Sequence, residues 1–183
     1  MNEWEKCPDY LAHINLDNER IAVNYFMWNY YVANNYDFTN KNILDWGCGG
    51  GVFARWVSSY YNIKSYTGID ISQRSIDECK KHINGDFYKL PNLPNKPFDV
   101  LVCFAVIQHM TMNQYVQFLE FVEESNIPDV VLQIRWAQES KYDVKNLIKR
   151  LKLSEVHLEN YNLAYESEVI SSNHYKYLVF HRK

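Results

Sequence analysis

The most informative segment of this sequence is Ile43-Leu44-Asp45-Trp46-Gly47-Cys48-Gly49-Gly50-Gly51-Val52-Phe53-Ala54. It predicts a short apolar strand with an acidic residue near its end, then a glycine turn, then an amphipathic helix. Four of the chain's 6 glycines fall within residues 47–51. Glycine reaches positive φ at little cost and lets a ligand approach the bare backbone. The clustering is therefore hard to explain by packing alone, and it indicates a ligand-binding loop.

The spacing of these glycines distinguishes between nucleotide-binding patterns. The dinucleotide fingerprint is G-x-G-x-x-G, and counted from Gly47 its third glycine position holds Val52, which disfavours an NAD-dependent oxidoreductase. A P-loop is excluded because no Gly-Lys-Ser/Thr follows. What remains is G-x-G-x-G, with Asp45 two positions before the first glycine. Residues 45–51 closely resemble motif I of the class I S-adenosylmethionine-dependent methyltransferases.

Three later segments resemble the same family in the family's order: residues 66–72, 84–87 and 98–110. In the first, the resemblance implies that Asp70 ends the second strand and holds the ribose diol, while Ile71 packs on adenine. The second resembles the end of the third strand, where Asp86 would accept from the adenine amino group and Phe87 would pack on the ring. The third looks like motif IV and the helical turn after the fourth strand.

The resemblance implies S-adenosylmethionine as the cofactor and S-adenosylhomocysteine as the product. The loop residues Gly47, Cys48 and Gly49 would contact it closely. Asp45 would lie near the cationic amino-acid end, directly or through water, and the backbone near Phe104 would help to hold that end.

Elements alternate along the chain in the order expected of an α/β fold. We predict strands near 42–46, 65–70, 84–88, 98–103 and 129–134, and helices near 51–61, 73–82, 112–125 and 141–152. Glu155 to Ala164 and His174 to Arg182 read as two strands without an intervening helix, so antiparallel pairing is expected. The predicted fold is a doubly wound, mostly parallel seven-stranded sheet with helices on both faces and an antiparallel C-terminal strand.

The length favours a single domain over 1–183. Within it, residues 1–40 would form an N-terminal helical segment covering the pocket, with a helix from Asn15 or Asp17 to about Asn35. Residues 41–183 would form the Rossmann-like core.

Candidates for the chemistry follow the fourth and fifth strands. His109 is the best general base, since its pKa range suits proton transfer; a role in capping or orienting the helix is the alternative. Arg135 and Trp136 would face the acceptor, or form a rim salt bridge and a packed indole. Tyr25 and Trp28 belong to an aromatic N-terminal segment that would cover the acceptor or pack on the sheet.

Composition excludes several other classes. A net charge of -3 gives no basic footprint for nucleic acid. The 4 cysteines show neither a C-x-x-C pair nor zinc spacing, and no metal site is expected. Without a signal peptide or an apolar stretch long enough to span a bilayer, a cytoplasmic protein is expected. The oligomeric state is left open by the sequence.

The leading hypothesis is methyl transfer to an oxygen or nitrogen of a small-molecule acceptor. One alternative is a methyltransferase that acts on protein or RNA with a partner subunit. Another is a non-catalytic S-adenosylmethionine-binding scaffold subunit. Methylation of a base amino group is disfavoured, because the position of the Asn/Asp-Pro-Pro-Tyr/Phe motif is occupied by Cys103-Phe104-Ala105-Val106.

Overall fold

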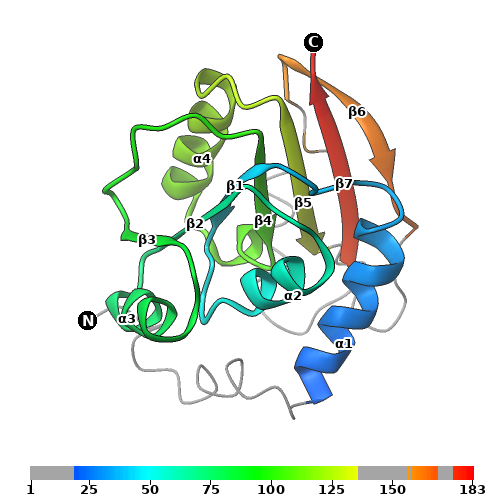
Figure 1. Ribbon diagram of the computed structural model, residues 1–183. Coiled ribbons are helices and arrows are strands. Elements are labelled where there is room, and N and C mark those ends of the chain that lie inside the picture. The colour runs from blue at the N-terminus through cyan, green and yellow to red at the C-terminus, as the bar shows by residue number, and fades with distance from the viewer. Residues whose placement is uncertain (1–18, 136–155, 157, 169–174) are drawn as a thin grey trace, which may run out of the picture. The chain divides into compact units, whose positions relative to one another are not determined.

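The computed structural model describes residues 19–135, 156, 158–168 and 175–183. Its strands form one seven-stranded sheet in the order β3-β2-β1-β4-β5-β7-β6 (Figure 1). The chain divides into two compact units, Met1–Leu101 and Val102–Lys183, which are described separately. The sheet confirms the predicted seven-stranded fold, while the single-domain organisation stays a prediction.

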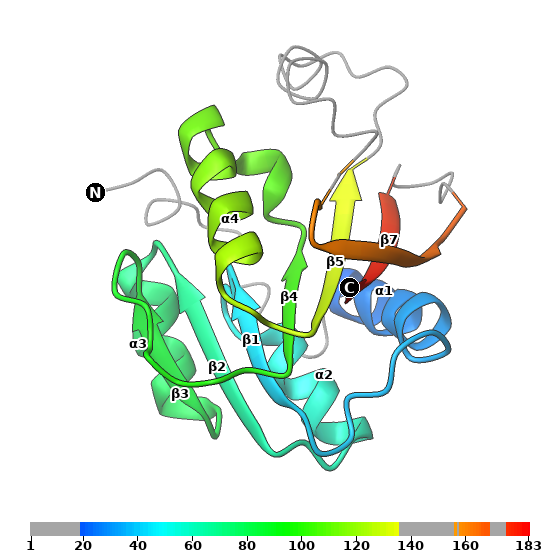
Figure 2. The ribbon, with the colours of Figure 1, turned by 90° about the horizontal axis from the view of Figure 1, so that it is seen from above.

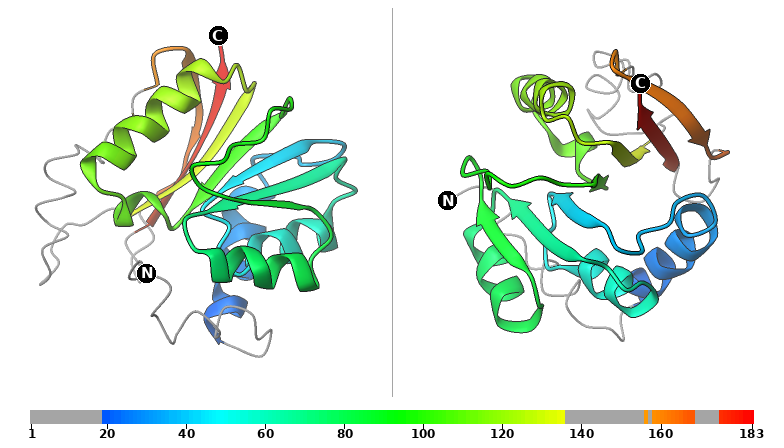
Figure 3. Two further views of the ribbon diagram at one scale, coloured as in Figure 1. Left: turned by 90° about the vertical axis from the view of Figure 1, so that its left-hand side faces the viewer. Right: turned by 45° about the horizontal axis from the view of Figure 1, so that its top comes forward.

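The first unit contains the glycine loop and most of the parallel strands. β2 pairs in parallel with both β1 and β3. Helices α2 and α3 lie along the same face of these strands (Figure 3). In chain order the elements are α1 (Glu19–Met27), the π-helix η3 (Trp28–Val32), β1 (Asn42–Trp46), α2 (Val52–Tyr60), β2 (Ser65–Asp70), α3 (Gln73–His82), β3 (Asp86–Lys89) and the start of β4 (Val100–Phe104).

Local signals in the sequence explain where the helices of this unit begin and end. α2 starts directly after Gly51, which adopts the left-handed conformation with φ 75°. α3 is capped by the Ser72 side chain, which accepts a hydrogen bond from the Ser75 N–H. Its last turn carries three basic residues that complement the helix dipole: Lys80, Lys81 and His82.

An aromatic cluster fills the space between α1, η3 and α2. We define it as Trp28, Phe38, Phe53 and Trp56, all of them buried. Its ring centroids lie 5.4 Å apart for Trp28 and Phe53 and 5.5 Å apart for Phe53 and Trp56. The Trp56 indole N–H donates to the Asn29 side-chain oxygen at 2.9 Å, so its polar group is satisfied within the cluster.

The second unit combines one long helix with the C-terminal strands. Thr111 and Gln114 form a capping box at the start of α4. β7 runs antiparallel to both of its neighbours, β5 and β6, which confirms the predicted reversed strand. The elements after β4 are the 3₁₀ turn η4 (Ile107–His109), α4 (Met112–Glu124), β5 (Asp129–Arg135), β6 (Tyr161–Glu166) and β7 (Tyr175–Arg182) (Figure 2).

Tyr161 fastens the C-terminal strands to the connection between α4 and β5. Its hydroxyl donates to the carbonyls of Ile127 at 2.7 Å and Val122 at 3.1 Å. Arg182 of β7 donates to the same hydroxyl at 3.2 Å and to the Glu123 carbonyl at 3.2 Å. β6 and β7 are thus held by side chains as well as by the sheet.

Most predicted boundaries agree with the structure to within two residues. The larger differences are that β6 begins at Tyr161 rather than near Glu155, and that the N-terminal helix continues as a π-helix from Trp28. The predicted helix over 141–152 lies outside the described residues. In the part of the chain that is described, no helix has the length and apolarity needed to cross a membrane.

Candidate cofactor site

The glycine loop is fixed to the second strand by its backbone. The N–H groups of Gly47 and Cys48 both donate to the Ile69 carbonyl, at 2.8 and 3.0 Å. Gly49 has φ 51°, and a Cβ there would meet no atom within 4 Å. Gly51 differs, because a Cβ there would lie 1.9 Å from the Ile83 side chain. Gly49 therefore leaves its backbone open to a ligand, while Gly51 serves the packing of α2.

Asp70 lies at the carboxyl end of β2, beside this loop. One of its carboxylate oxygens accepts from the Gly49 N–H at 2.9 Å, and the other accepts from the Ser72 N–H at 2.8 Å. Burial raises the pKa of this carboxyl, while the backbone donors of Ser72, Gly49 and Ile71 oppose the rise. The structure thus brings Gly49, Asp70 and the half-buried Ile71 together, as predicted.

Asp45 ends up almost enclosed. Only 3% of it is exposed, and its Oδ2 accepts a short hydrogen bond from the Tyr66 hydroxyl. Burial raises the pKa of Asp45 to about 7, the Tyr66 hydrogen bond lowers it, and the Asp70 charge raises it further. Tyr66 was not predicted from the sequence, because nothing in a strand residue's identity shows which buried group it will meet.

Two buried cysteines lie next to these carboxyl groups. The Cys79 thiol, from α3, donates to the Gly49 carbonyl at 3.2 Å. The pKa of the Cys48 thiol is raised well above its usual range by its hydrogen bond with Cys79 and by burial. The Cys48 thiol is therefore a structural group rather than a reactive thiolate. We call this set of buried polar residues the polar cluster: Asp45, Cys48, Tyr66, Asp70 and Cys79.

Asp86 is a correction to the sequence prediction. It was expected to end the third strand, but it begins β3 and pairs with Thr67, three residues before Asp70. Its exposed carboxylate forms an ion pair with Lys96 at 2.6 Å. The residue paired with Asp70 is Lys89. Because ligands bind at the carboxyl ends of parallel strands, Asp86 lies at the opposite end of its strand from the expected site.

Phe87 is buried, but in a packing role. Its ring lies 5.9 Å from that of Tyr66. A Cβ built on Gly68 would come within 2.8 Å of Phe87 and of the Cys48 sulfur, so this ring occupies the space that Gly68 leaves vacant. The structure therefore places Phe87 in the core beside the polar cluster.

The remaining predicted residues lie in the second unit. Phe104 ends β4 and packs edge-on against Tyr177, with 6.1 Å between ring centroids. Ala105 follows it with φ 57°, which is unusual for a residue with a Cβ. His109 is exposed at the end of η4. Arg135 is the last residue of β5, and Trp136 lies outside the described residues.

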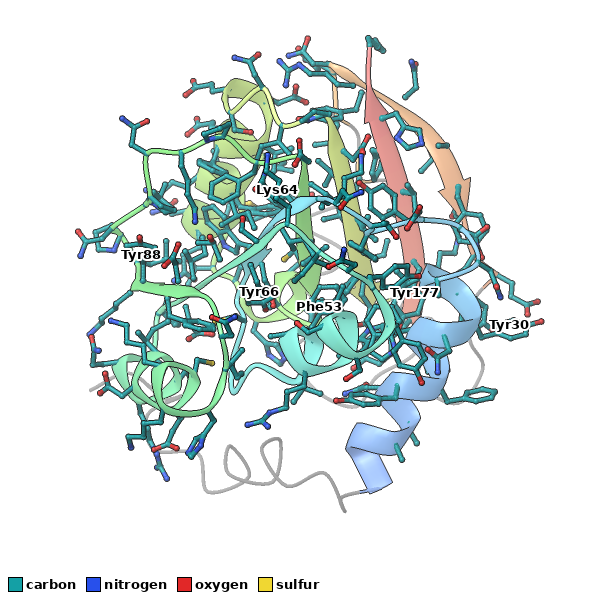
Figure 4. All side chains as sticks on the ribbon, viewed as in Figure 1. Tyr30, Phe53, Lys64, Tyr66, Tyr88 and Tyr177 are labelled. Atoms are coloured by element: carbon teal, nitrogen blue, oxygen red, sulfur yellow. The ribbon has the colours of Figure 1, made fainter. Side chains whose placement is uncertain are left out.

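The two residues of the first unit that were predicted to cover the acceptor, Tyr25 and Trp28, differ in their burial. Trp28 is buried in the aromatic cluster, which favours its packing role. Tyr25 is half-buried, and burial raises the pKa of its hydroxyl while the neighbouring Arg55 opposes the rise. In Figure 4, Phe53 lies in the interior, whereas Tyr30 projects from the surface.

Arg55 is a candidate that sequence reasoning missed. Its backbone N–H donates to Gly51, which places it one helical turn after the glycine loop. Its buried Nε has no hydrogen-bond partner among the described residues. An arginine in the fourth position of an amphipathic helix looks like an ordinary surface residue, so the sequence gives no signal for this arrangement.

The residues present fit an adenosyl cofactor. Gly49 offers open space at its backbone, and Asp70 places a carboxylate beside it that can accept from a ribose diol. Within the described residues no group of His, Cys, Asp and Glu is arranged to hold a metal ion.

The comparisons with known proteins agree with this geometry. Residues 43–125 match the family described as "Methyltransferase domain". The chain is 30% identical over 96 residues to the fatty-acid O-methyltransferase of Mycolicibacterium smegmatis, covering 48% of this chain and 33% of that protein. It is 28% identical over 89 residues to the ubiquinone biosynthesis O-methyltransferase of Coxiella burnetii, covering 44% and 37%. The chain thus spans about a third of the length of these relatives.

Among solved structures, the fold is similar to that of magnesium protoporphyrin IX methyltransferase from Synechocystis PCC 6803 with bound S-adenosylmethionine. The TM-score is 0.58 at 15% identity, and the match covers 100% of this chain and 85% of that one. This likeness concerns the fold, whereas the sequence match covers the glycine loop and Asp70 themselves. The sheet order, the loop geometry and the family match over residues 43–125 together support a class I, Rossmann-like S-adenosylmethionine-dependent methyltransferase.

Proposed function

We propose that the chain transfers a methyl group from S-adenosylmethionine to an oxygen or nitrogen of a small-molecule acceptor. The observation that carries the proposal is the Gly49–Asp70 pair, in which an open glycine backbone adjoins a carboxylate at the end of β2. Asp70 would hold the ribose, with Ile71 beside the adenine and Gly47, Cys48 and Gly49 along the loop. Asp45 would serve the amino-acid end, and the contact expected from the backbone near Phe104 stays a prediction.

The adenine edge needs a different residue from the one predicted. Asp86 is ion-paired at the start of β3, so we assign the adenine side to the carboxyl end of that strand. There the Leu90 N–H donates to the Asp70 carbonyl at 2.9 Å, which keeps the chain after β3 beside the ribose-holding residue. Phe87 stays a core residue in this assignment.

A small acceptor is supported by the relatives, since the two described above are named for a fatty acid and for ubiquinone biosynthesis. S-adenosylmethionine, when bound, supplies a methyl group activated by a sulfonium. Much of the protein's contribution is then positioning and the exclusion of water. An oxygen or amine acceptor must also lose a proton, and His109 is our candidate for the base.

Arg55 and Tyr25 are our candidates for the acceptor side in the first unit. A guanidinium without an acidic partner among the described residues suits an anionic group, which it can bind in a bidentate manner. We therefore infer that acceptors carrying a carboxylate or a phenolate are preferred. Arg135 and Trp136 stay candidates by their position after the fifth strand.

The test is thermal unfolding with S-adenosylhomocysteine, S-adenosylmethionine and NAD added separately. At a hundred times its dissociation constant a ligand adds about 2.7 kcal/mol, or roughly 5–10 °C for a domain of this size. A shift with the adenosyl compounds alone supports the proposal, and a shift with NAD alone contradicts it.

Turnover distinguishes an enzyme from a scaffold. Transfer of labelled methyl is measured on carboxylic acids, phenols and amines, with their neutral esters and ethers as matched controls. His109→Ala should lower the rate by at least ~10²-fold while cofactor affinity is kept. Cofactor binding without transfer to any acceptor would favour the scaffold instead.

A further inference from the structure

Tyr66 and Asp45 form a buried hydrogen-bonded pair beneath the glycine loop. Each is 3% exposed, and they come from adjacent parallel strands in which Asp45 pairs with Gly68. Side chains alternate along a strand, so Asp45 and Tyr66 project from the same face of β1 and β2. Figure 4 shows Tyr66 in the interior of its unit.

Among the described residues, the groups around Asp45 include no positive partner. Tyr66 and Asp70 face it from β2, and Cys48 faces it from the loop. Cys79 of α3 faces Tyr66 and Cys48. Within the part of the chain that the structure describes, the pKa of this carboxyl is shifted by burial, by Tyr66 and by Asp70. A buried carboxyl group in such surroundings keeps its proton to unusually high pH. A hydroxyl that donates to the ionised form lowers the pKa again.

We propose that Tyr66 is a positioning residue: its hydroxyl holds the buried Asp45 carboxyl beneath the glycine loop, and this carboxyl gives up its proton when the cationic cofactor binds. The inference rests on the proposed function, because the cationic amino group of the cofactor is the charge that Asp45 would balance. The proton leaves the Asp45 carboxyl for solvent as that cation arrives, and no covalent bond changes between heavy atoms.

The sign of the effect follows from linkage. Below about pH 7 the free protein holds a proton on Asp45, and a nearby cation favours the ionised form. Affinity for the cofactor therefore rises with pH through this range and levels off above it. Removing the Tyr66 hydroxyl raises the pKa of Asp45, so the same rise is displaced to higher pH.

The experiment is isothermal titration calorimetry of the full chain with S-adenosylhomocysteine, which keeps the cationic amino group. It is done between about pH 5.5 and 8.5, in two buffers of different ionisation enthalpy, so that proton release is measured separately from affinity. We expect proton release in the unaltered chain and none in Asp45→Asn. Tyr66→Phe should bind about 3–10-fold more weakly at neutral pH, with its affinity rise at higher pH.

Tyr30→Phe is the control, because it removes the hydroxyl of a tyrosine on η3 that is 57% exposed and lies outside the polar cluster. It should behave as the unaltered chain. Circular dichroism checks that each variant folds. If Tyr66→Phe does not fold, Asp45→Asn supplies the test.

Two negative results have different meanings. If S-adenosylhomocysteine does not bind at any pH, the proposed function is wrong. If it binds without proton release, and Tyr66→Phe keeps the same pH profile as the unaltered chain, the role assigned to Tyr66 is wrong while the proposed function stands.

Discussion

The polar cluster and the aromatic cluster are both buried in the first unit, yet their contents are opposite. The polar cluster holds two buried carboxyl groups, whereas the aromatic cluster consists of four large rings, and the Trp56 indole N–H donates to the neighbouring Asn29. Burial of carboxyl groups opposes folding, while burial of large rings favours it. The difference teaches that the apolar packing of this unit and its buried ionisable groups are supplied by separate sets of residues.

The largest effect should come from removing the centre of the aromatic cluster. Trp56 is 0% exposed and contacts several rings, so Trp56→Ala should lower the free energy of unfolding by about 3–5 kcal/mol. Phe26, which is 66% exposed, is the control, and Phe26→Ala should change it by about 0.5 kcal/mol or less. Urea unfolding measures both. Equal losses in the two variants would contradict the assignment of the core.

The polar cluster should make the free energy of unfolding depend on pH. Asp45 has an ordinary pKa of 3.8 and a folded value of about 7, so the folded state binds its proton more tightly than the unfolded state. Stability should fall as pH rises from about 4 to 7 and then level off, by about 2–4 kcal/mol in all. Asp45→Asn should flatten this slope in thermal unfolding. An unchanged slope would show that the carboxyl does not titrate in this range.

The sequence was sufficient for the strands, the glycine loop and the Asp70 position, because strand periodicity and glycine spacing are local signals. It was not sufficient for Asp86, whose place along β3 depends on its register with β2. Tyr66 and Arg55 were missed because a hydroxyl or guanidinium acquires its partners only in the folded chain. The sequence could not decide whether Trp28 packs in the core or contacts the acceptor, since a buried and a half-buried aromatic residue look alike in sequence.

Two neighbouring glycines sharpen the comparison. Gly51→Ala places a Cβ 1.9 Å from the Ile83 side chain in a left-handed conformation, so it should lower stability by about 2–3 kcal/mol. Gly49→Ala meets no atom within 4 Å and should cost about 1 kcal/mol, from its left-handed φ alone. Its methyl group would, however, occupy the ligand side of the loop. Binding of S-adenosylhomocysteine to Gly49→Ala should therefore fall by more than its stability does.

The last prediction concerns a single carboxylate. Asp70→Asn should lower affinity for S-adenosylhomocysteine by about 10–100-fold, because a charged acceptor of two hydrogen bonds is lost. Calorimetry measures it, and Asp86→Asn is the matched control that should leave affinity unchanged, since Asp86 lies at the other end of β3. A larger loss in Asp86→Asn than in Asp70→Asn would restore the original adenine assignment.

The order of the last two strands has a consequence for synthesis on the ribosome. β7 follows β6 in the chain but lies between β5 and β6 in the sheet. A nascent chain that has emerged only as far as Glu166 carries β6 without the neighbour to which it pairs. Since domains emerge from their N-termini first, the sheet of the second unit can close only after Tyr175–Arg182 has been released. Until then the backbone N–H and C=O groups along this edge of β5 lack the partners that β7 supplies, which makes this the interval in which a chaperone has most to protect.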